Sequence, residues 1–199
     1  MAHSSYRDWD EVYRDYPAEV LPWELGKPRK NLTDLVENGG IQPGSALDLC
    51  CGLGTNTVYM GQKGFDVTAV EISKHALELA KRKAHKAKVE IKFVLASFVT
   101  LPFKDAAFDF VFDMGCFHHV EVEDRPEFIQ GVRRILKPKS NYLLICFSER
   151  NGRAWNHFTK EQIAEHFSEK FKLTKLDHFG SVEGDGYTRL FYSALMQPR

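Results

Sequence analysis

The fold of this chain is decided by the stretch ALDLCCGLG, residues 46–54. Its first four residues predict a short buried strand, and the next five form a glycine-containing loop. Gly52 and Gly54 allow the backbone to approach a ligand closely, because glycine has no Cβ in the way. Residues 55–63 read as a helix that begins directly after the loop. A strand, a glycine loop and a helix in this order predict a ligand site at the carboxyl end of a parallel strand.

Helices and strands alternate along most of the remaining chain. Further strands are predicted at 65–70, 90–95, 108–113 and 141–147, and helices at 73–85, 125–136 and 159–167. Two last strands, 171–179 and 187–196, are joined by the glycine-rich loop 180–186 and predict an antiparallel hairpin. The alternation predicts an α/β fold: a Rossmann-like three-layer α/β/α sandwich around a mostly parallel seven-stranded sheet.

An acidic residue at the second strand narrows the choice of ligand. Glu71 ends that strand, nineteen residues after Gly52, and its carboxylate can accept two hydrogen bonds from ribose hydroxyls. A dinucleotide fingerprint requires a third glycine where this chain has Thr57. Asp48, inside the first strand, suits a ligand with an ammonium group better than a pyrophosphate. These residues favour S-adenosylmethionine over a dinucleotide.

Four sequence blocks resemble class I S-adenosylmethionine-dependent methyltransferases, from about residue 30 to the end. In chain order they are ALDLCCGLG (46–54), VTAVEIS (67–73), LPFKDAAFDFVFD (101–113) and ILKP (135–138). The resemblance implies that the chain transfers a methyl group from S-adenosylmethionine to a small-molecule nucleophile. It also implies a sheet whose seventh strand is antiparallel, in agreement with the predicted hairpin.

The resemblance also implies a set of cofactor-binding residues. They are Trp23, Asp48, Cys50, Gly52, Gly54, Glu71, Ile72, Ser97, Phe98 and Asp113. Asp48 and the glycine loop would hold the methionine end, Glu71 the ribose, and Ile72 would flank the adenine. Two positions depart from the family pattern, because Cys50 stands where the family usually has a glycine and Ser97 where it often has an aspartate.

A narrower resemblance concerns the N-terminal residues. The string PWELGKP, residues 22–28, is similar to the segment before the core in thiopurine, thiol, halide and tellurite methyltransferases. In that group an aromatic N-terminal segment covers the cofactor. We therefore expect residues 1–29 to form an aromatic lid that includes Trp23, and residues 30–199 to form the methyltransferase domain. The alternative is that the N-terminal aromatic residues are ordinary core packing.

Two residues at or after the fourth predicted strand are candidates for catalysis. Asp113 could contact the ligands or only cap a loop, and His118 could act as a general base. Adjacent residues point in different directions, so the pair His118 and His119 predicts no metal site, and we expect no metal. The lack of a convincing base favours a soft, easily ionised acceptor such as a thiol or metalloid. O-, N- or C-methylation and a non-catalytic cofactor-binding module are the alternatives.

Composition excludes several other classes. Lys plus Arg and Asp plus Glu each number 27, so the formal charge is zero, which argues against a general nucleic-acid binder. No apolar run is long enough for a membrane span or a signal peptide. The four cysteines do not form a secreted disulfide framework, and Cys50 and Cys51 read as small buried hydrophobic residues. We expect a reduced, cytoplasmic monomer or weak homodimer that acts on a small molecule, without nucleic-acid or membrane partners.

Overall fold

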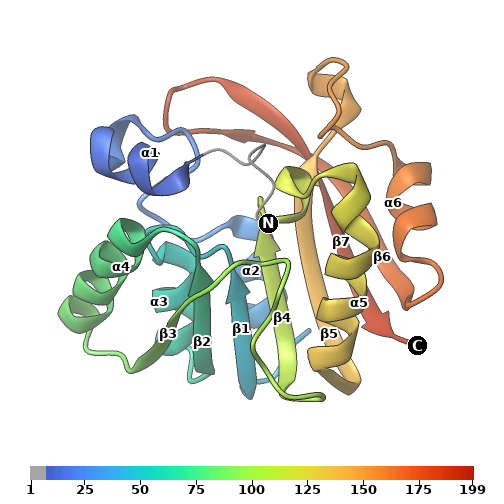
Figure 1. Cartoon of the computed structure of the whole chain (residues 1–199), viewed down its shortest axis with the longest axis horizontal. Helices are drawn as coiled ribbons and strands as arrows, with labels where there is room; N and C mark the ends of the chain where they lie inside the picture. The colour runs from blue at the N-terminus through green and yellow to red at the C-terminus, as the bar shows by residue number, and fades with distance from the viewer. Residues whose placement is uncertain (1–7) are drawn as a thin grey trace.

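One seven-stranded sheet, in the order β3-β2-β1-β4-β5-β7-β6, organises the chain (Figure 1). The structure is a computed structural model that describes residues 8–199; residues 1–7, with Tyr6 of the expected lid, lie outside the described part. The strands are β1 (Ser45–Leu49), β2 (Asp66–Glu71), β3 (Ile91–Leu95), β4 (Phe108–Met114), β5 (Leu136–Phe147), β6 (Phe171–Val182) and β7 (Thr188–Pro198). The predicted number and order of strands along the chain are confirmed.

The sheet is parallel except at one edge. Strands β1 to β5 pair in parallel, whereas β7 lies between β5 and β6 and is antiparallel to both. The chain runs outward from β1 to β3 and then returns to place β4 on the other side of β1. Leu49 and Asp113 are partners across β1 and β4. The loops that follow these two strands therefore meet at the point where the strand order reverses, which is where such sheets bind ligands.

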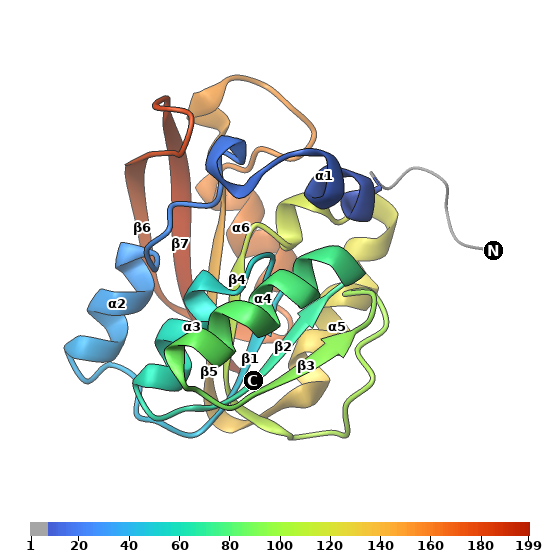
Figure 2. The same cartoon turned by 90° about the vertical axis from the view of Figure 1, so that its left-hand side faces the viewer.

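Helices cover both faces of the sheet and make the three layers that the sequence predicts (Figures 1 and 2). They are α1 (Trp9–Asp15), α2 (Lys30–Glu37), α3 (Thr55–Gln62), α4 (Lys74–Ala87), α5 (Arg125–Ile135) and α6 (Lys160–Phe167). Helices α2, α3 and α4 cover one face, and α5 and α6 cover the other. None of the helices in residues 8–199 combines the length and the apolar character needed to cross a bilayer.

The central strands are apolar on both faces because both faces are covered. Successive residues of β4 point to opposite sides, so Phe110 and Phe112 belong to a core cluster with Leu32 of α2. Val111 between them belongs to the other cluster, with Phe128 of α5. This arrangement explains why β4 reads as a near-continuous apolar run.

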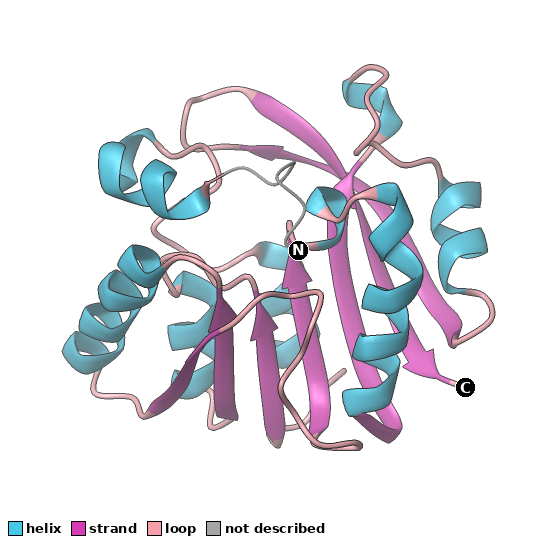
Figure 3. Ribbon diagram, in the orientation of Figure 1, coloured by secondary structure: helices cyan, strands magenta, loops and turns pink. Residues whose placement is uncertain are grey.

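Capping residues in the sequence predict where a helix begins, whereas pairing between strands can make a strand longer than its sequence predicts. The Ser73 hydroxyl accepts the N–H of Ala76 at 3.0 Å, which confirms the predicted cap of α4. Strand β5 begins at Leu136, five residues before the predicted Asn141, because Leu136 still pairs with Phe108 of β4. Figure 3 shows the helix–strand alternation and the long hairpin of β6 and β7 that ends it.

Candidate functional site

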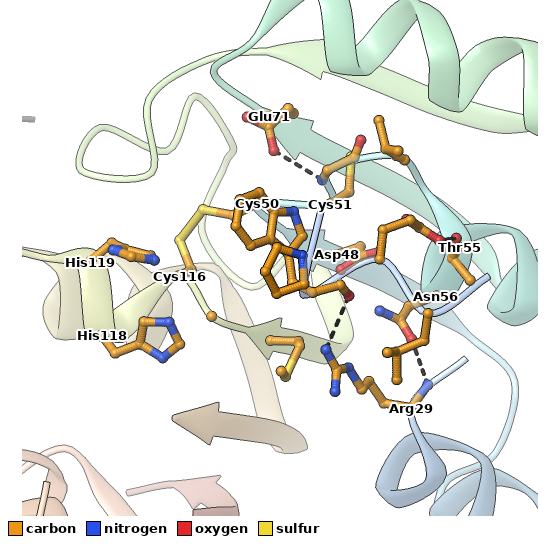
Figure 4. A pocket seen from close by; sticks show the side chains of 18 of the residues that line it. Arg29, Asp48, Cys50, Cys51, Thr55, Asn56, Glu71, Cys116, His118 and His119 are labelled. Atoms are coloured by element: carbon orange, nitrogen blue, oxygen red, sulfur yellow. Dashed lines mark hydrogen bonds between the residues drawn. A yellow bond between two sulfur atoms is a disulfide. The ribbon is translucent and has the colours of Figure 1, made fainter. Parts of the chain in front are cut away.

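A cavity of about 300 Å³ opens at the carboxyl ends of β1, β2 and β4. The ends of the strands, the N-terminal segment and the hairpin of β6 and β7 contribute its walls (Figure 4). The cavity brings together most of the residues that the sequence singles out, namely Trp23, Asp48, Cys50, Gly52, Glu71, Ile72, Phe98 and His118. Three others, Gly54, Ser97 and Asp113, do not line it, and their roles toward a ligand stay predictions.

Gly54 and Ser97 have local structural tasks. Gly54 precedes α3 with φ +75°, and a Cβ there would lie 2.8 Å from the Cβ of Ala80 in α4. Glycine at this position therefore allows α3 and α4 to pack closely. The Ser97 hydroxyl accepts the N–H of Val99 at 3.2 Å, while its neighbour Phe98 is buried and faces the cavity.

The carboxylate of Glu71 is held by three backbone N–H groups. Gly52 donates to Oε2 at 2.9 Å, and Ile72 and Ser73 donate to Oε1 at 2.8 and 3.0 Å. Burial raises the pKa of Glu71, and the three hydrogen bonds oppose that rise. A carboxylate has about four acceptor sites, so one site on Oε2 is left for a ligand hydroxyl.

Asp48 lies in the floor of the cavity. Its carboxylate accepts the hydroxyl of Thr57 at 2.5 Å. Burial, together with the nearby charges of Asp113 and Glu71, raises the pKa of Asp48 to about 7, and the hydrogen bond from Thr57 opposes that rise. A cationic group of a ligand would favour the ionised form. The geometry therefore fits the ammonium that the sequence predicts at this position.

Asp113 lies below the cavity and fixes the loop after β4. It is fully buried, accepts the hydroxyl of Tyr142 at 2.9 Å and accepts the N–H of Cys116 at 2.8 Å. Burial raises the pKa of Asp113 to about 7, against the effect of these bonds. The carboxylate thus sets the position of the turn that presents Cys116 and His118.

His118 lines the cavity and has one buried ring nitrogen without a hydrogen-bond partner. The side chain is 3% exposed, and its ring stacks on Phe147 with centroids 4.1 Å apart. Among the described residues, its Nδ1 is the one buried side-chain nitrogen or oxygen without a hydrogen-bond partner. Burial, with the nearby His119, His157 and Arg29, holds the pKa of His118 well below its usual 6.5. His118 is therefore a neutral imidazole.

The expectation that the two adjacent histidines point apart is wrong. The turn Phe117–His119 places both rings at the cavity, with His118 and His119 centroids 4.6 Å apart. A tight turn rotates successive side chains much less than an extended strand does. Within residues 8–199, no group of three or more His, Cys, Asp or Glu side chains is placed to hold a metal ion.

The reading of Cys50 as a small buried hydrophobic residue in a reduced chain is also wrong. Cys50 is half-buried, lines the cavity and forms a disulfide with Cys116, with their Cα atoms 5.6 Å apart. The two cysteines are 66 residues apart in sequence, and only the pairing of β1 with β4 brings them together. Cys51 is free and buried, as the sequence predicts, and Cys146 is free and buried as well.

The N-terminal segment packs directly over the loop after β1. The indole N–H of Trp23 donates to the hydroxyl of Tyr13 at 3.2 Å. That hydroxyl faces Gly52 so closely that a Cβ on Gly52 would lie 2.8 Å from it. Tyr13 and Leu21 form a small core with Leu53 and Ala76.

A buried ion pair joins the N-terminal segment to the far side of the cavity. Arg29 donates two hydrogen bonds, of 2.7 and 2.8 Å, to the carboxylate of Glu183 in the hairpin of β6 and β7. The N–H of Gly184 donates to the carbonyl of Pro22 at 2.7 Å. Neither Arg29 nor Glu183 is recognisable as a site residue from the sequence, because 154 positions separate them and neither lies in a recognisable motif.

Comparison with known proteins assigns the family. Residues 46–139 match the profile of a family described as methyltransferase domain. The chain is 31% identical over 155 residues to the probable thiol methyltransferase 2 of Arabidopsis thaliana, across 76% of this chain and 67% of that protein. The chain belongs to the S-adenosylmethionine-dependent methyltransferase family. The expectation drawn from the four sequence blocks is confirmed.

A second relative agrees with this family, and a solved structure shares the fold. The chain is 27% identical over 146 residues to the 2-heptyl-1-hydroxyquinolin-4(1H)-one methyltransferase of Mycobacteroides abscessus, across 71% of this chain and 64% of that protein. The N-methyltransferase NodS from Bradyrhizobium japonicum WM9, solved with S-adenosyl-L-homocysteine, shares the fold with a TM-score of 0.75 and 12% identity. That match covers 95% of this chain and 97% of NodS. The chain spans 64% and 67% of the lengths of the two curated relatives.

The cavity of this methyltransferase fits the parts of S-adenosylmethionine. The buried carboxyl of Asp48 suits the ammonium of the methionine end, and the remaining acceptor site of Glu71 suits a ribose hydroxyl. Ile72, next to Glu71 and 45% exposed, offers apolar surface to an adenine. The fit differs from the sequence prediction in one respect. Glu71 has one acceptor site left rather than two, so a second ribose bond requires the N–H of Gly52 to move away.

Proposed function

We propose that this methyltransferase transfers a methyl group from S-adenosylmethionine to a small-molecule nucleophile bound in the same cavity. One observation supports the proposal: the two sides of the cavity have different chemistry. The side at β1 and β2 carries the carboxylates of Asp48 and Glu71, and the side at β4 and β5 carries the stacked rings of His118 and Phe147. The first side suits the cofactor and the second suits an acceptor.

The protein acts mainly by alignment in this proposal. S-adenosylmethionine, when bound, supplies an electrophilic methyl group on a positively charged sulfur. Asp48, Glu71 and Ile72 hold it at the ends of β1 and β2. Holding two reactants in line lowers a barrier by roughly 7–11 kcal/mol. The N-terminal segment, with Trp23 and Tyr13 over the loop after β1, excludes water from the reacting groups.

His118 is the residue that we assign to proton handling. Its ring lines the cavity, and its Nδ1 is buried without a partner in the described part of the chain. We assign this nitrogen to accept the acidic hydrogen of an acceptor after the ring turns toward the cavity. Its low pKa makes it a weak base, which suits acceptors that ionise readily. Asp113 is a positioning residue in this proposal. Its carboxylate accepts the N–H of Cys116 and so fixes the turn that carries His118.

Two acceptor classes follow from these contacts. A thiol or metalloid anion is our first candidate, because such nucleophiles need little help from a base, and the name of the Arabidopsis relative points to thiols. A flat aromatic acceptor is the second, because the stacked rings of His118, Phe147 and Phe191 all line the cavity. We keep the expectation of a cytoplasmic monomer or weak homodimer without nucleic-acid partners.

A methyl-transfer assay tests the proposal. Labelled S-adenosylmethionine is offered with thiols, selenols, arsenite, tellurite, halides and aromatic hydroxyl compounds, and S-adenosylhomocysteine is measured as the second product. A parallel series contains a chelator, and transfer should continue there. The Asp48→Asn variant serves as the control with a disabled cofactor site. Tight cofactor binding without turnover on any acceptor would instead favour a non-catalytic cofactor-binding module.

A further inference from the structure

Cys50 has a backbone conformation that glycine would adopt more easily. Its φ is +52°, in the left-handed region that side chains with a Cβ disfavour. Residues held in such conformations concentrate at functional sites, where the side chain has a task. The side chain of Cys50 reaches Cys116, and both residues line the cavity. The strained backbone of Cys50 and its place at the cavity therefore indicate that its sulfur atom has a function.

We propose that Cys50 and Cys116 are a reversible redox modification site, with low-molecular-mass disulfides and thiols as reaction partners, and that closure of the disulfide changes the affinity for the cofactor. The inference rests on the proposed function only for its effect on the cofactor. The thiol–disulfide chemistry itself depends on the two cysteines alone.

The disulfide crosses the middle of the site. It joins the loop after β1 to the loop after β4, and Figure 4 shows Asp48 and Glu71 on one side of it and His118 and His119 on the other. A methyl group must pass between these two sides during transfer. A covalent bond at this point fixes both loops and places two sulfur atoms in the cavity that the ligands share.

The exposure of the two sulfur-bearing residues gives them different tasks. Cys50 is half-buried and accessible from the cavity, whereas Cys116 is 1% exposed. The thiolate of Cys50 attacks one sulfur of a small disulfide, and the first small thiol leaves with a proton. The thiol of Cys116 then loses its proton and displaces the second small thiol from Cys50. The two cysteines lose two electrons and two protons, and the small disulfide gains them.

The two remaining cysteines should not take part in thiol–disulfide exchange. Cys51 and Cys146 are buried, and burial raises the pKa of each thiol well above its usual value. A buried thiol with a raised pKa reacts slowly with disulfides. Cys146 lies in the core and does not line the cavity, so a Cys146→Ala variant is a matched control that removes one thiol elsewhere.

The test compares the full chain after reduction by a phosphine and after treatment with oxidised glutathione. Alkylation and intact mass count the thiols, and calorimetry measures S-adenosylhomocysteine binding in each form. We expect oxidation to remove two thiols, those of Cys50 and Cys116. We expect it to change the dissociation constant for S-adenosylhomocysteine by about tenfold or more, which corresponds to about 1.4 kcal/mol.

Single substitutions show whether the Cys50–Cys116 disulfide, rather than oxidation of another residue, changes the affinity. Cys50→Gly suits the positive φ and lacks the attacking thiol, so its affinity should not differ between the two treatments. Cys116→Ser lacks the second thiol, so oxidised glutathione should stop at a mixed disulfide on Cys50, which intact mass detects as one added glutathione. Cys146→Ala should respond like the wild type. Failure of the pair to oxidise, or equal affinity in both forms, would overturn the inference and leave the proposed function intact. Binding in neither form would overturn both the control of binding and the proposed function.

Discussion

The carboxylate of Glu71, at the end of β2, accepts the backbone N–H of Gly52 at 2.9 Å. This bond ties the loop after β1 to the neighbouring strand and sets the shape of the cofactor side of the cavity. It also occupies one acceptor site of the residue that we assign to the ribose. The ligand and the loop therefore compete for the same carboxylate. Removal of the Glu71 carboxylate should change both the cofactor affinity and the stability of the protein, and each can be measured separately.

Glu71→Ala should weaken S-adenosylhomocysteine binding by about 1–3 kcal/mol, the cost of losing hydrogen bonds to a charged group. The variant should also be less stable, because the N–H groups of Gly52, Ile72 and Ser73 lose their acceptor. Calorimetry gives the first quantity and thermal unfolding the second. Glu71→Gln retains one acceptor oxygen and should show smaller effects. A folded Glu71→Ala protein with unchanged affinity would show that another residue binds the ribose.

Asp48→Asn should make the ligand-free protein more stable at pH 8 while it weakens cofactor binding. Burial raises the pKa of Asp48 from 3.8 to about 7, and at about 1.36 kcal/mol per pKa unit this sets an upper limit of about 4 kcal/mol on the gain. The amide can still accept the hydroxyl of Thr57 but offers no charge to an ammonium. Chemical unfolding and calorimetry measure the two changes. If the variant is less stable than the wild type at pH 8, the ionised carboxylate of Asp48 does not destabilise the ligand-free protein.

The same two buried carboxyls predict how pH acts on the protein. Asp48 and Asp113 both have a pKa of about 7 in the folded chain, above the usual 3.8. A carboxyl whose pKa is higher in the folded state binds more protons when folded. Its contribution to stability is therefore complete below about pH 4 and is lost as the pH rises to about 7. Asp48→Asn should flatten this dependence in unfolding experiments across that range.

Cofactor binding should have the opposite dependence on pH. An ammonium group requires Asp48 to be ionised, so the affinity for S-adenosylhomocysteine should decrease below about pH 7, by up to about tenfold per unit. Above pH 7 it should level off. Calorimetry at several pH values gives the profile, and Asp48→Asn should remove most of the slope. A flat profile for the wild-type protein would show that Asp48 is not the partner of the ammonium.

His118→Phe should reduce kcat by roughly 100- to 10,000-fold for acceptors that must lose a proton. Phenylalanine can keep the stacking on Phe147 but removes Nδ1, so KM and stability should change little. Acceptors that are already anionic at the assay pH should be methylated at nearly the normal rate. Steady-state kinetics with one acceptor of each kind provides the comparison. Equal losses for both kinds would assign His118 to positioning rather than proton transfer.

Residues 8–27 should exchange their amide hydrogens more slowly when S-adenosylhomocysteine is bound. The segment covers the loop after β1 through Tyr13 and Trp23, so an occupied cavity should hold it in place. Trp23→Ala should reduce transfer more than stability, because an indole near a sulfonium contributes about 1 kcal/mol. Trp155→Ala, at a tryptophan that is 51% exposed and outside the cavity, is the matched control. Unchanged exchange, with unfolding of Trp23→Ala, would make this segment ordinary core.

Local sequence patterns predicted the fold, and they also predicted that Asp48, Gly52 and Glu71 lie together at the carboxyl ends of the strands. The block at residues 46–54, the cap at Ser73 and the apolar run of β4 are local patterns, and each depends on neighbours a few residues away. Asp48, Gly52 and Glu71 follow from these patterns, because a residue at the carboxyl end of a parallel strand has its position fixed by the strand.

The contacts between distant residues could not be predicted, because they depend on which strands become neighbours in the folded sheet. The order of β1 and β4 brings Cys50 to Cys116, and the return of the hairpin brings Glu183 to Arg29. Likewise, the turn after β4 places the ring of His118 against Phe147, where its Nδ1 is buried without a partner. Contacts between residues 29 to 154 positions apart carry no local signal, since their free energy comes from packing that exists only in the folded chain.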